Sequence, residues 1–306
     1  MRSILTTRPG RSVTYEESPC NTALNRVQGM GFRWSLNPYL GCVHGCHYCY
    51  ARRYHAFREL DAGADFSSIV FVRSGIEAVL RRELRRPSWK REEVALGTAT
   101  DPYQPIEGRH RLTRGCLHAL ADHSTPVGVV TKGTLVVRDI DILSQMSETP
   151  GCTVTFSLTT LDPDLWSRLE PGTSPPRQRL RALERLVREG VCAGVLLAPV
   201  LPALTHRRAD LEEVVRAAAD HGARFLGSRS LYLQSGTREH FLEFLEMEFP
   251  GLVAEYQRLF AGPYAPPGFQ RHVHDVVREL KETYAITDRE TLRQAPMSLR
   301  QLELAI

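Results

Sequence analysis

The stretch Asn37-Pro-Tyr-Leu-Gly-Cys42-Val-His-Gly-Cys46-His-Tyr-Cys49-Tyr50 is the most informative part of the sequence, because it spaces three cysteines as C-x3-C-x2-C. Three thiolates on one short loop can hold three irons of a cubane cluster and leave the fourth iron without a protein ligand. An open metal position is where chemistry can take place. Glycines at positions 41 and 45 let the loop wrap closely around such a cluster. The spacing therefore predicts a catalytic [4Fe–4S] cluster.

Two other interpretations of the triplet remain open from the residues alone. A zinc ion would need a fourth ligand, which His44 or His47 could supply, although zinc sites usually combine two widely separated pairs of ligands. Three structural cysteines buried in a glycine-containing loop would need no metal. We favour the cluster, because a strand is expected directly before the loop. Outside the triplet the sequence contains no second C-x2-C pair, so we expect no auxiliary cluster.

The overall composition is that of an ordinary globular protein, with 306 residues of which 42% are hydrophobic and 24% are charged. No apolar run approaches the roughly 20 residues needed to cross a bilayer. The N-terminus lacks the apolar stretch of a secretory signal. Seven cysteines, an odd number, speak against a disulfide framework. We therefore expect a cytoplasmic protein with no membrane partner.

Short apolar segments alternate with helical patterns from about Gly31 onward, which is typical of a parallel sheet covered by helices. Strands are expected at Phe32–Tyr39, Val94–Gly97, Pro126–Thr131, Cys152–Thr159, Cys192–Pro199 and Phe225–Leu233. Helices are expected over residues 50–60, 75–86, 112–121, 138–146, 176–189 and 208–221, and a short extended run over 68–73. Six such units predict an α/β fold, a partial (β/α)6 barrel rather than an eight-unit barrel of about 250 residues.

The two ends of the chain are expected to flank this barrel. Residues 1–30 are polar and predict an irregular N-terminal extension that lies on the surface. Residues 31–235 would form the barrel, and residues 236–306 a helical C-terminal extension that packs back on it. Within that extension, residues 261–268 are rich in proline and glycine and predict a linker.

The triplet and several further motifs resemble those of the radical S-adenosylmethionine (SAM) superfamily. The further motifs resemble the subgroup related to spore photoproduct lyase, and the resemblance covers roughly residues 30–230. They are Thr98–Glu107 (TATDPYQPIE), Thr131-Lys132, Arg138–Asp141, Glu170–Pro176 with Arg179-Leu180, and Ala198–Leu204. The resemblance implies a cluster whose open iron is chelated by SAM. One electron then releases methionine and a 5′-deoxyadenosyl radical, which abstracts hydrogen from a substrate.

The resemblance also implies roles for individual residues. Cys42, Cys46 and Cys49 would bind the cluster. The expected SAM contacts are Tyr48 at the adenine, Thr100 and Asp101 at the amino group, Lys132 at the carboxylate, Ser157 at the ribose or carboxylate, and Ala198 at the adenine pocket. Thr100 and Asp101 are candidates only, because this sequence lacks the Gly-Gly-Glu motif usual there. Tyr103 and Glu107 are candidate catalytic residues, although Glu107 is equally explained as the first residue of a helix. Glu170 and Arg179 are expected to form an ion pair that braces the barrel.

The substrate stays open between a nucleic acid and a small molecule or peptide. Residues 1–60 hold eight arginines against three glutamates, and the segment Arg81–Arg91 is rich in arginine, which favours an anionic partner. A solvated basic surface explains the same residues. No cysteine lies between residues 50 and 115, which speaks against the lyase reaction itself. A non-enzymatic iron–sulfur electron carrier is the third interpretation. An external one-electron donor of the flavodoxin or ferredoxin type would be required.

Overall fold

The computed structural model describes residues 2–8 and 11–288, and its main sheet has seven strands in the order β11-β10-β9-β8-β7-β4-β3. The strands are β3 (Leu24–Arg26), β4 (Trp34–Leu36), β7 (Val94–Leu96), β8 (Val127–Thr131), β9 (Cys152–Leu158), β10 (Ala193–Val200) and β11 (Leu226–Ser230). The six strands from β4 to β11 pair in parallel, and β3 joins β4 antiparallel. Most of these strands are buried, which explains their continuous apolar sequence. The predicted partial (β/α)6 barrel is confirmed.

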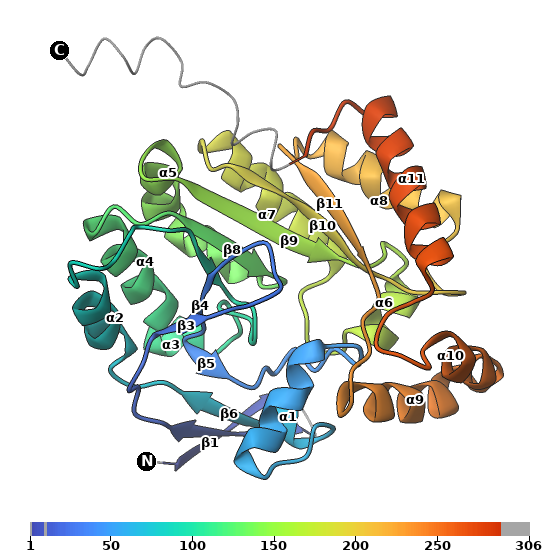
Figure 1. Cartoon of the computed structure of the whole chain (residues 1–306), viewed down its shortest axis with the longest axis horizontal. Coiled ribbons are helices and arrows are strands. Elements are labelled where there is room, and N and C mark those ends of the chain that lie inside the picture. Colours follow the sequence, from blue (N-terminus) through green and yellow to red (C-terminus); the bar gives the residue numbers. More distant parts are fainter. Residues whose placement is uncertain (1, 9–10, 289–306) are drawn as a thin grey trace.

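Amphipathic helices cover the outer face of this sheet (Figure 1). They are α2 (Ile76–Leu84), α4 (Leu112–Asp122), α5 (Ile140–Glu148), α7 (Pro176–Arg188) and α8 (Arg208–Asp220). Their apolar residues, such as Leu80, Leu117 and Leu183, form one buried cluster with the strands. Shorter elements complete this part of the chain: the 3-10 helices η1 (Tyr50–Arg58) and η2 (Thr134–Asp139), and the helices α1 (Asp65–Ser68), α3 (Glu107–His110) and α6 (Pro163–Leu169).

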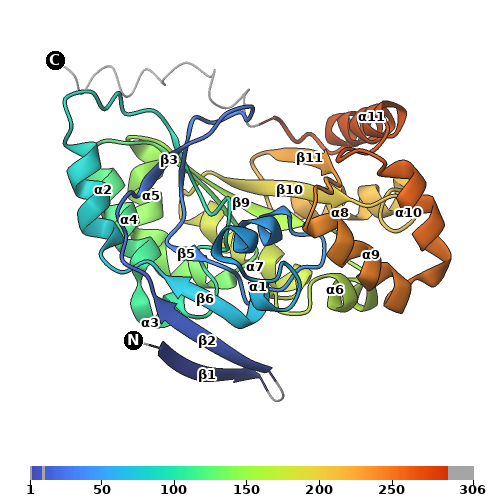
Figure 2. The same ribbon diagram turned by 60° about the horizontal axis from the view of Figure 1, so that its bottom comes forward.

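The N-terminal residues form a second sheet, so the expectation of an irregular extension is wrong. β1 (Arg2–Arg8) and β2 (Arg11–Glu17) make a hairpin, and β2 pairs in parallel with β6 (Ile69–Val72). Figure 2 shows this hairpin at the lower edge of the molecule. The strand β2 forms because Val13 and Tyr15 alternate with polar residues and are buried against β6.

The predicted strand Phe32–Tyr39 is divided between the two sheets. β4 ends at Leu36, and β5 (Tyr39–Leu40) pairs with β6 in the second sheet. Asn37 and Pro38 separate them, and proline cannot donate a hydrogen bond to a sheet. This change of sheet places the cysteine loop, which follows β5, over the carboxyl ends of the parallel strands.

The C-terminal part is helical, with α9 (Thr237–Glu248), η3 (Pro250–Leu252), α10 (Val253–Leu259) and α11 (Pro267–Thr283). Apolar residues of α11 such as Val277 join the main core beside α8. Phe241 and Phe244 of α9 instead pack with Cys46 and Tyr48 of the cysteine loop. Residues 289–306 of the predicted C-terminal extension lie outside the described residues, and its boundaries stay predictions. Among the described helices, none is long and apolar enough to cross a membrane.

Candidate active site

Three free cysteines lie together on the loop between β5 and η1. Cys42 and Cys46 are buried, and Cys49 is half-buried. Burial raises the pKa of all three thiols, to about 12 for Cys46. After burial, the charge of Asp101 raises the pKa of Cys42 further, as does repulsion between its thiolate form and those of Cys46 and Cys49. A bound cation would be needed to hold this set as thiolates, and a cubane cluster fits a set of three cysteine ligands.

The buried side chain of Arg52 holds this loop by hydrogen bonds to its backbone. Its side chain is only 1% exposed and donates to the carbonyls of Cys46 (2.9 Å) and Gly45 (2.8 Å). It also donates to the carbonyls of Ala62 and Gly63, at 2.9 and 2.7 Å. Hydrogen bonds to four carbonyls, two on the loop and two on the neighbouring turn, fix the two segments against each other. Sequence analysis counted Arg52 only as part of a basic surface, because nothing in the sequence shows that it is buried.

The turn after α6 holds the other side of the loop. The backbone N–H of Gly172 donates to the His44 carbonyl at 2.9 Å, and that of His47 donates to the Leu169 carbonyl at 3.1 Å. A Cβ at Gly172 would lie 2.2 Å from the Val43 carbonyl oxygen. This position therefore requires glycine, because two backbones meet there.

Polar groups from the ends of β8, β9 and β10 meet beside the cysteine loop: the side chains of Lys132 and Ser157 and the backbone carbonyl of Ala198. The ammonium group of Lys132 donates to the Ser157 hydroxyl at 2.7 Å, and Ser157 donates to the Ala198 carbonyl at 2.9 Å. Lys132 also lies 5.6 Å from the centre of the Tyr48 ring. Its charge lowers the pKa of the Cys46 and Cys49 thiols, so it lies near them. The structure thus brings together four of the predicted SAM contacts: Tyr48, Lys132, Ser157 and Ala198.

A buried ion pair between Glu170 and Arg179 supports this group. Arg179 is fully buried, and its guanidinium also donates to the Ser157 carbonyl at 2.9 Å. Glu170 accepts a hydrogen bond from the Tyr48 hydroxyl and lies 3.0 Å from the Thr159 hydroxyl. Burial acts to raise the pKa of Glu170, but Arg179 and Lys132 outweigh it and bring that pKa to about 2. The expected ion pair is present, and these contacts fit a bracing role.

Thr159 is a member of this network that sequence analysis missed. Its hydroxyl lies 2.9 Å from that of Tyr48 and 3.0 Å from both the Glu170 carboxylate and the Ala198 carbonyl, and its one proton can be donated to either of these two acceptors. One signal was available, because Thr159 stands at the carboxyl end of the predicted fourth strand, two residues after Ser157.

Thr100 and Asp101 lie on the Cys42 side of the loop, and both are committed to partners within the protein. Thr100 donates to the Gly41 carbonyl at 2.6 Å. Asp101 accepts from the backbone N–H of Lys132 at 2.6 Å and faces Nδ1 of His44 at 3.3 Å. Burial acts to raise the pKa of Asp101, but His44 and the hydrogen bonds lower it to about 2. Asp101 thereby positions Lys132.

The zinc interpretation finds no support in the geometry. His44 faces Asp101, and Nδ1 of His47 lies 3.1 Å from Nε2 of His240. Across the described part of the chain, no group of three or more histidine, cysteine or acidic side chains is arranged to hold a single metal ion. Three free cysteines on one loop are the ligand set that a cubane cluster takes.

Tyr103 and Glu107 lie apart from the cysteine network. The Tyr103 hydroxyl donates to Asp139 at 3.1 Å. Glu107 accepts from the Tyr39 hydroxyl at 2.6 Å and pairs with Arg138 at 2.7 Å. Both side chains are buried, at 2% and 0% exposure. These contacts fit bracing, and a catalytic role for either residue stays a prediction.

Comparisons with known proteins relate this chain to others at the level of family and fold. Residues 36–218 match the family model described as the radical SAM superfamily. "Uncharacterized protein Rv2578c" of Mycobacterium tuberculosis is 39% identical over 278 residues, which span 90% of this chain and 82% of that protein. "Uncharacterized protein MJ0683" of Methanocaldococcus jannaschii is 24% identical over 262 residues, spanning 85% and 90%.

Among solved structures, spore photoproduct lyase complexed with dinucleoside spore photoproduct is similar in fold, with a TM-score of 0.65 and 16% identity. The alignment covers 88% of this chain and 79% of that one. A second lyase structure, a mutant with bound AdoMet and the dinucleoside, gives a TM-score of 0.64 at 16% identity with the same coverage.

Proposed function

Because the chain belongs to the radical SAM superfamily and is a radical SAM enzyme, we propose that Cys42, Cys46 and Cys49 bind a [4Fe–4S] cluster. SAM binds next to it, against Tyr48 and Lys132, and a substrate loses a hydrogen atom there. The observation that carries this proposal is the meeting of three free thiols with a lysine ammonium group at the ends of the parallel strands. Active sites of such barrels lie at that end.

When bound, the cluster and SAM would supply the chemistry: one electron from the external donor would cleave SAM to methionine and a 5′-deoxyadenosyl radical. The protein binds and orients them. Lys132 places a positive charge where the SAM carboxylate would lie; Ser157 accepts a hydrogen bond from its ammonium group, and Asp101 accepts one from its backbone N–H. Tyr48 offers its ring to the adenine, while Glu170 and Thr159 hold its hydroxyl. The carbonyl of Ala198 accepts a hydrogen bond from the Ser157 hydroxyl and lies within hydrogen-bond distance of the Thr159 hydroxyl, which fixes the end of β10 beside the proposed adenine pocket.

The partners follow from the chemistry. An external one-electron donor of the flavodoxin or ferredoxin type must reduce the cluster, because the sequence contains no second C-x2-C pair for an auxiliary cluster. We place the protein in the cytoplasm, where thiols remain reduced.

A nucleic acid is the second candidate for the substrate class, beside a small molecule or peptide. It is favoured by the exposed arginines 82, 85, 86 and 91 on and after α2, none of which forms an ion pair within the described residues. The lyase structures that share the fold contain a dinucleoside, which shows that such a fold can accommodate one.

The test is an anaerobic reconstitution with iron and sulfide, followed by reduction with dithionite in the presence of SAM. We expect 5′-deoxyadenosine. Formation that DNA or RNA oligonucleotides accelerate, and that added salt suppresses, would support the nucleic-acid candidate. Slow formation that is indifferent to oligonucleotides would support a small molecule or peptide. An intact cluster with bound SAM and no 5′-deoxyadenosine would contradict the proposed activity and leave an electron carrier.

A further inference from the structure

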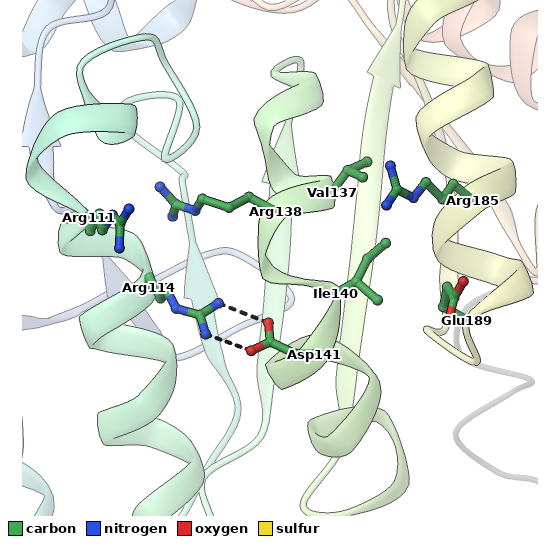
Figure 3. Close-up of a pocket in the computed structure, with 8 residues that line it drawn as sticks. All are labelled: Arg111, Arg114, Val137, Arg138, Ile140, Asp141, Arg185 and Glu189. Atoms are coloured by element: carbon green, nitrogen blue, oxygen red, sulfur yellow. Dashed lines mark hydrogen bonds and ion pairs between the residues drawn. The ribbon is translucent and has the colours of Figure 1, made fainter.

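A second concave site lies on the helical layer, away from the cysteine loop. It is a pocket of about 430 Å³ formed by α4, η2, α5 and α7. None of the three cysteines and none of the predicted SAM contacts lines it. Figure 3 shows Arg111 and Arg138 on one side and Arg185 reaching in from α7, with Val137 and Ile140 between them.

The arginines of this pocket differ in how well their charges are neutralised. Arg114 pairs with Asp141 at 2.6 Å and with Asp139 at 2.9 Å. Arg138 pairs with Glu107 and Asp139, at 2.7 and 2.8 Å. These acidic partners are therefore already engaged.

The other two arginines have no such partners. Within the described residues, neither Arg111 nor Arg185 has an ion pair or a side-chain hydrogen bond, and both side chains are exposed. Glu189 is the one carboxylate of the lining that pairs with none of these arginines. Two guanidiniums thus remain available on opposite sides of the pocket, and the uncommitted carboxylate of Glu189 lies on the α7 side with Arg185 (Figure 3).

We propose that this pocket binds a small phosphorylated ligand. Guanidinium groups present paired N–H donors that match phosphate oxygens. Val137 and Ile140 offer an apolar surface for the organic part of that ligand. The carboxylates Asp141 and Glu189 at the rim disfavour a continuous polyanion, so a compact ligand fits better than a nucleic-acid backbone.

The site has a structural connection to the proposed active site. Arg138 donates to the Glu107 carbonyl at 3.0 Å as well as to its carboxylate. Its other partner, Asp139, accepts from the Tyr103 hydroxyl at 3.1 Å, and Tyr103 belongs to the same loop as Asp101. A ligand held between Arg111, Arg138 and Arg185 would therefore contact Arg138, whose partners Glu107 and Asp139 hold that loop in place. The binding itself does not depend on cluster or SAM chemistry.

The test is isothermal titration calorimetry of the full chain, with inorganic pyrophosphate as the probe. The test variant is the double substitution Arg111→Ala with Arg185→Ala. The control is Arg181→Ala, which removes an exposed arginine of the same helix α7 that does not line the pocket. Circular dichroism establishes that each variant is folded, and because neither arginine holds another side chain, the double variant should keep the wild-type melting temperature. A short DNA duplex is titrated in parallel.

We expect saturable one-to-one binding of pyrophosphate to the wild type, at least tenfold weaker binding to the double variant, and unchanged binding to the control. The absence of saturable binding to the wild type would overturn the proposal. An equal loss in the control would overturn it as well, because it would show a general charge effect. Tighter binding of the duplex, weakened by the same double substitution, would replace the compact ligand with a polyanion surface.

Discussion

Replacement of Gly172 by alanine tests how the cysteine loop is held. A Cβ at this position would lie 2.2 Å from the Val43 carbonyl oxygen and 2.8 Å from Cα of His44. Real Cβ contacts essentially never fall below 3.0 Å, so the Val43 carbonyl must retreat by at least the difference, 0.8 Å. Both clashing groups are backbone and cannot rotate away. Gly172 does not have a positive φ, so the substitution carries no dihedral cost of its own.

The expected cost combines two effects. Overpacking of this size costs about 1–3 kcal/mol. Weakening the hydrogen bond from Gly172 to the His44 carbonyl, 2.9 Å in the wild type, costs about 1 kcal/mol more. We therefore expect the free energy of unfolding of the chain without its cluster to fall by roughly 2–4 kcal/mol. Val43 and His44 lie between Cys42 and Cys46, so their displacement should also reduce the iron bound per chain.

The assays are urea denaturation of the cluster-free chain and iron and sulfide analysis after anaerobic reconstitution. Gly251→Ala is the matched control, because a Cβ there would meet nothing within 4 Å. If the two variants unfold with the same free energy and bind the same amount of iron, the loop is not held by the turn at Gly172, and this reasoning is refuted.

Two further predictions concern the polar network. Lys132→Ala should leave the cluster intact and weaken SAM binding about tenfold, because it removes one half-exposed charged hydrogen bond worth about 1.5 kcal/mol. Equilibrium dialysis of SAM against the reconstituted protein measures this affinity, and Lys90→Ala, which changes an exposed lysine, is the control. An unchanged affinity for SAM in Lys132→Ala would contradict the assigned role. The folded-state pKa of Glu170, about 2, lies below its ordinary value of 4.5, so the stability that its carboxylate contributes is complete above pH 4.5 and is lost as the pH falls toward 2. The stability advantage of the wild type over Glu170→Gln, from urea denaturation of the cluster-free chains, should therefore shrink across that interval, and a constant difference would show that Arg179 does not stabilise the ionised form.

Much of the barrel could be predicted because its signals are local. The strands β7 to β10 are short apolar runs, such as Val127–Thr131, and each is followed by an amphipathic helix. Residues at the ends of parallel strands meet by topology alone, so Lys132, Ser157 and Ala198 could be expected near one another before their contacts were known.

The rest depends on contacts between distant segments, which leave little trace in a single sequence. The hairpin β1–β2 carries many polar residues, and it is stabilised as part of a sheet by β6, more than fifty residues later in the chain. Arg52 looks like any surface arginine, yet it is buried among four carbonyls. Gly172 shows its role only when the loop containing Val43 is in place.

The central claim is that the three cysteines of the loop hold the cluster, and Cys46→Ala tests it most directly. The single measurement is 5′-deoxyadenosine formed per chain after anaerobic reconstitution and dithionite reduction with SAM. Cys192→Ala, which changes a cysteine outside the triplet, is the matched control. We predict that Cys46→Ala forms no 5′-deoxyadenosine, because two thiolates cannot hold the cubane, while the control keeps the wild-type amount. Formation by Cys46→Ala at the level of the control would contradict the assignment.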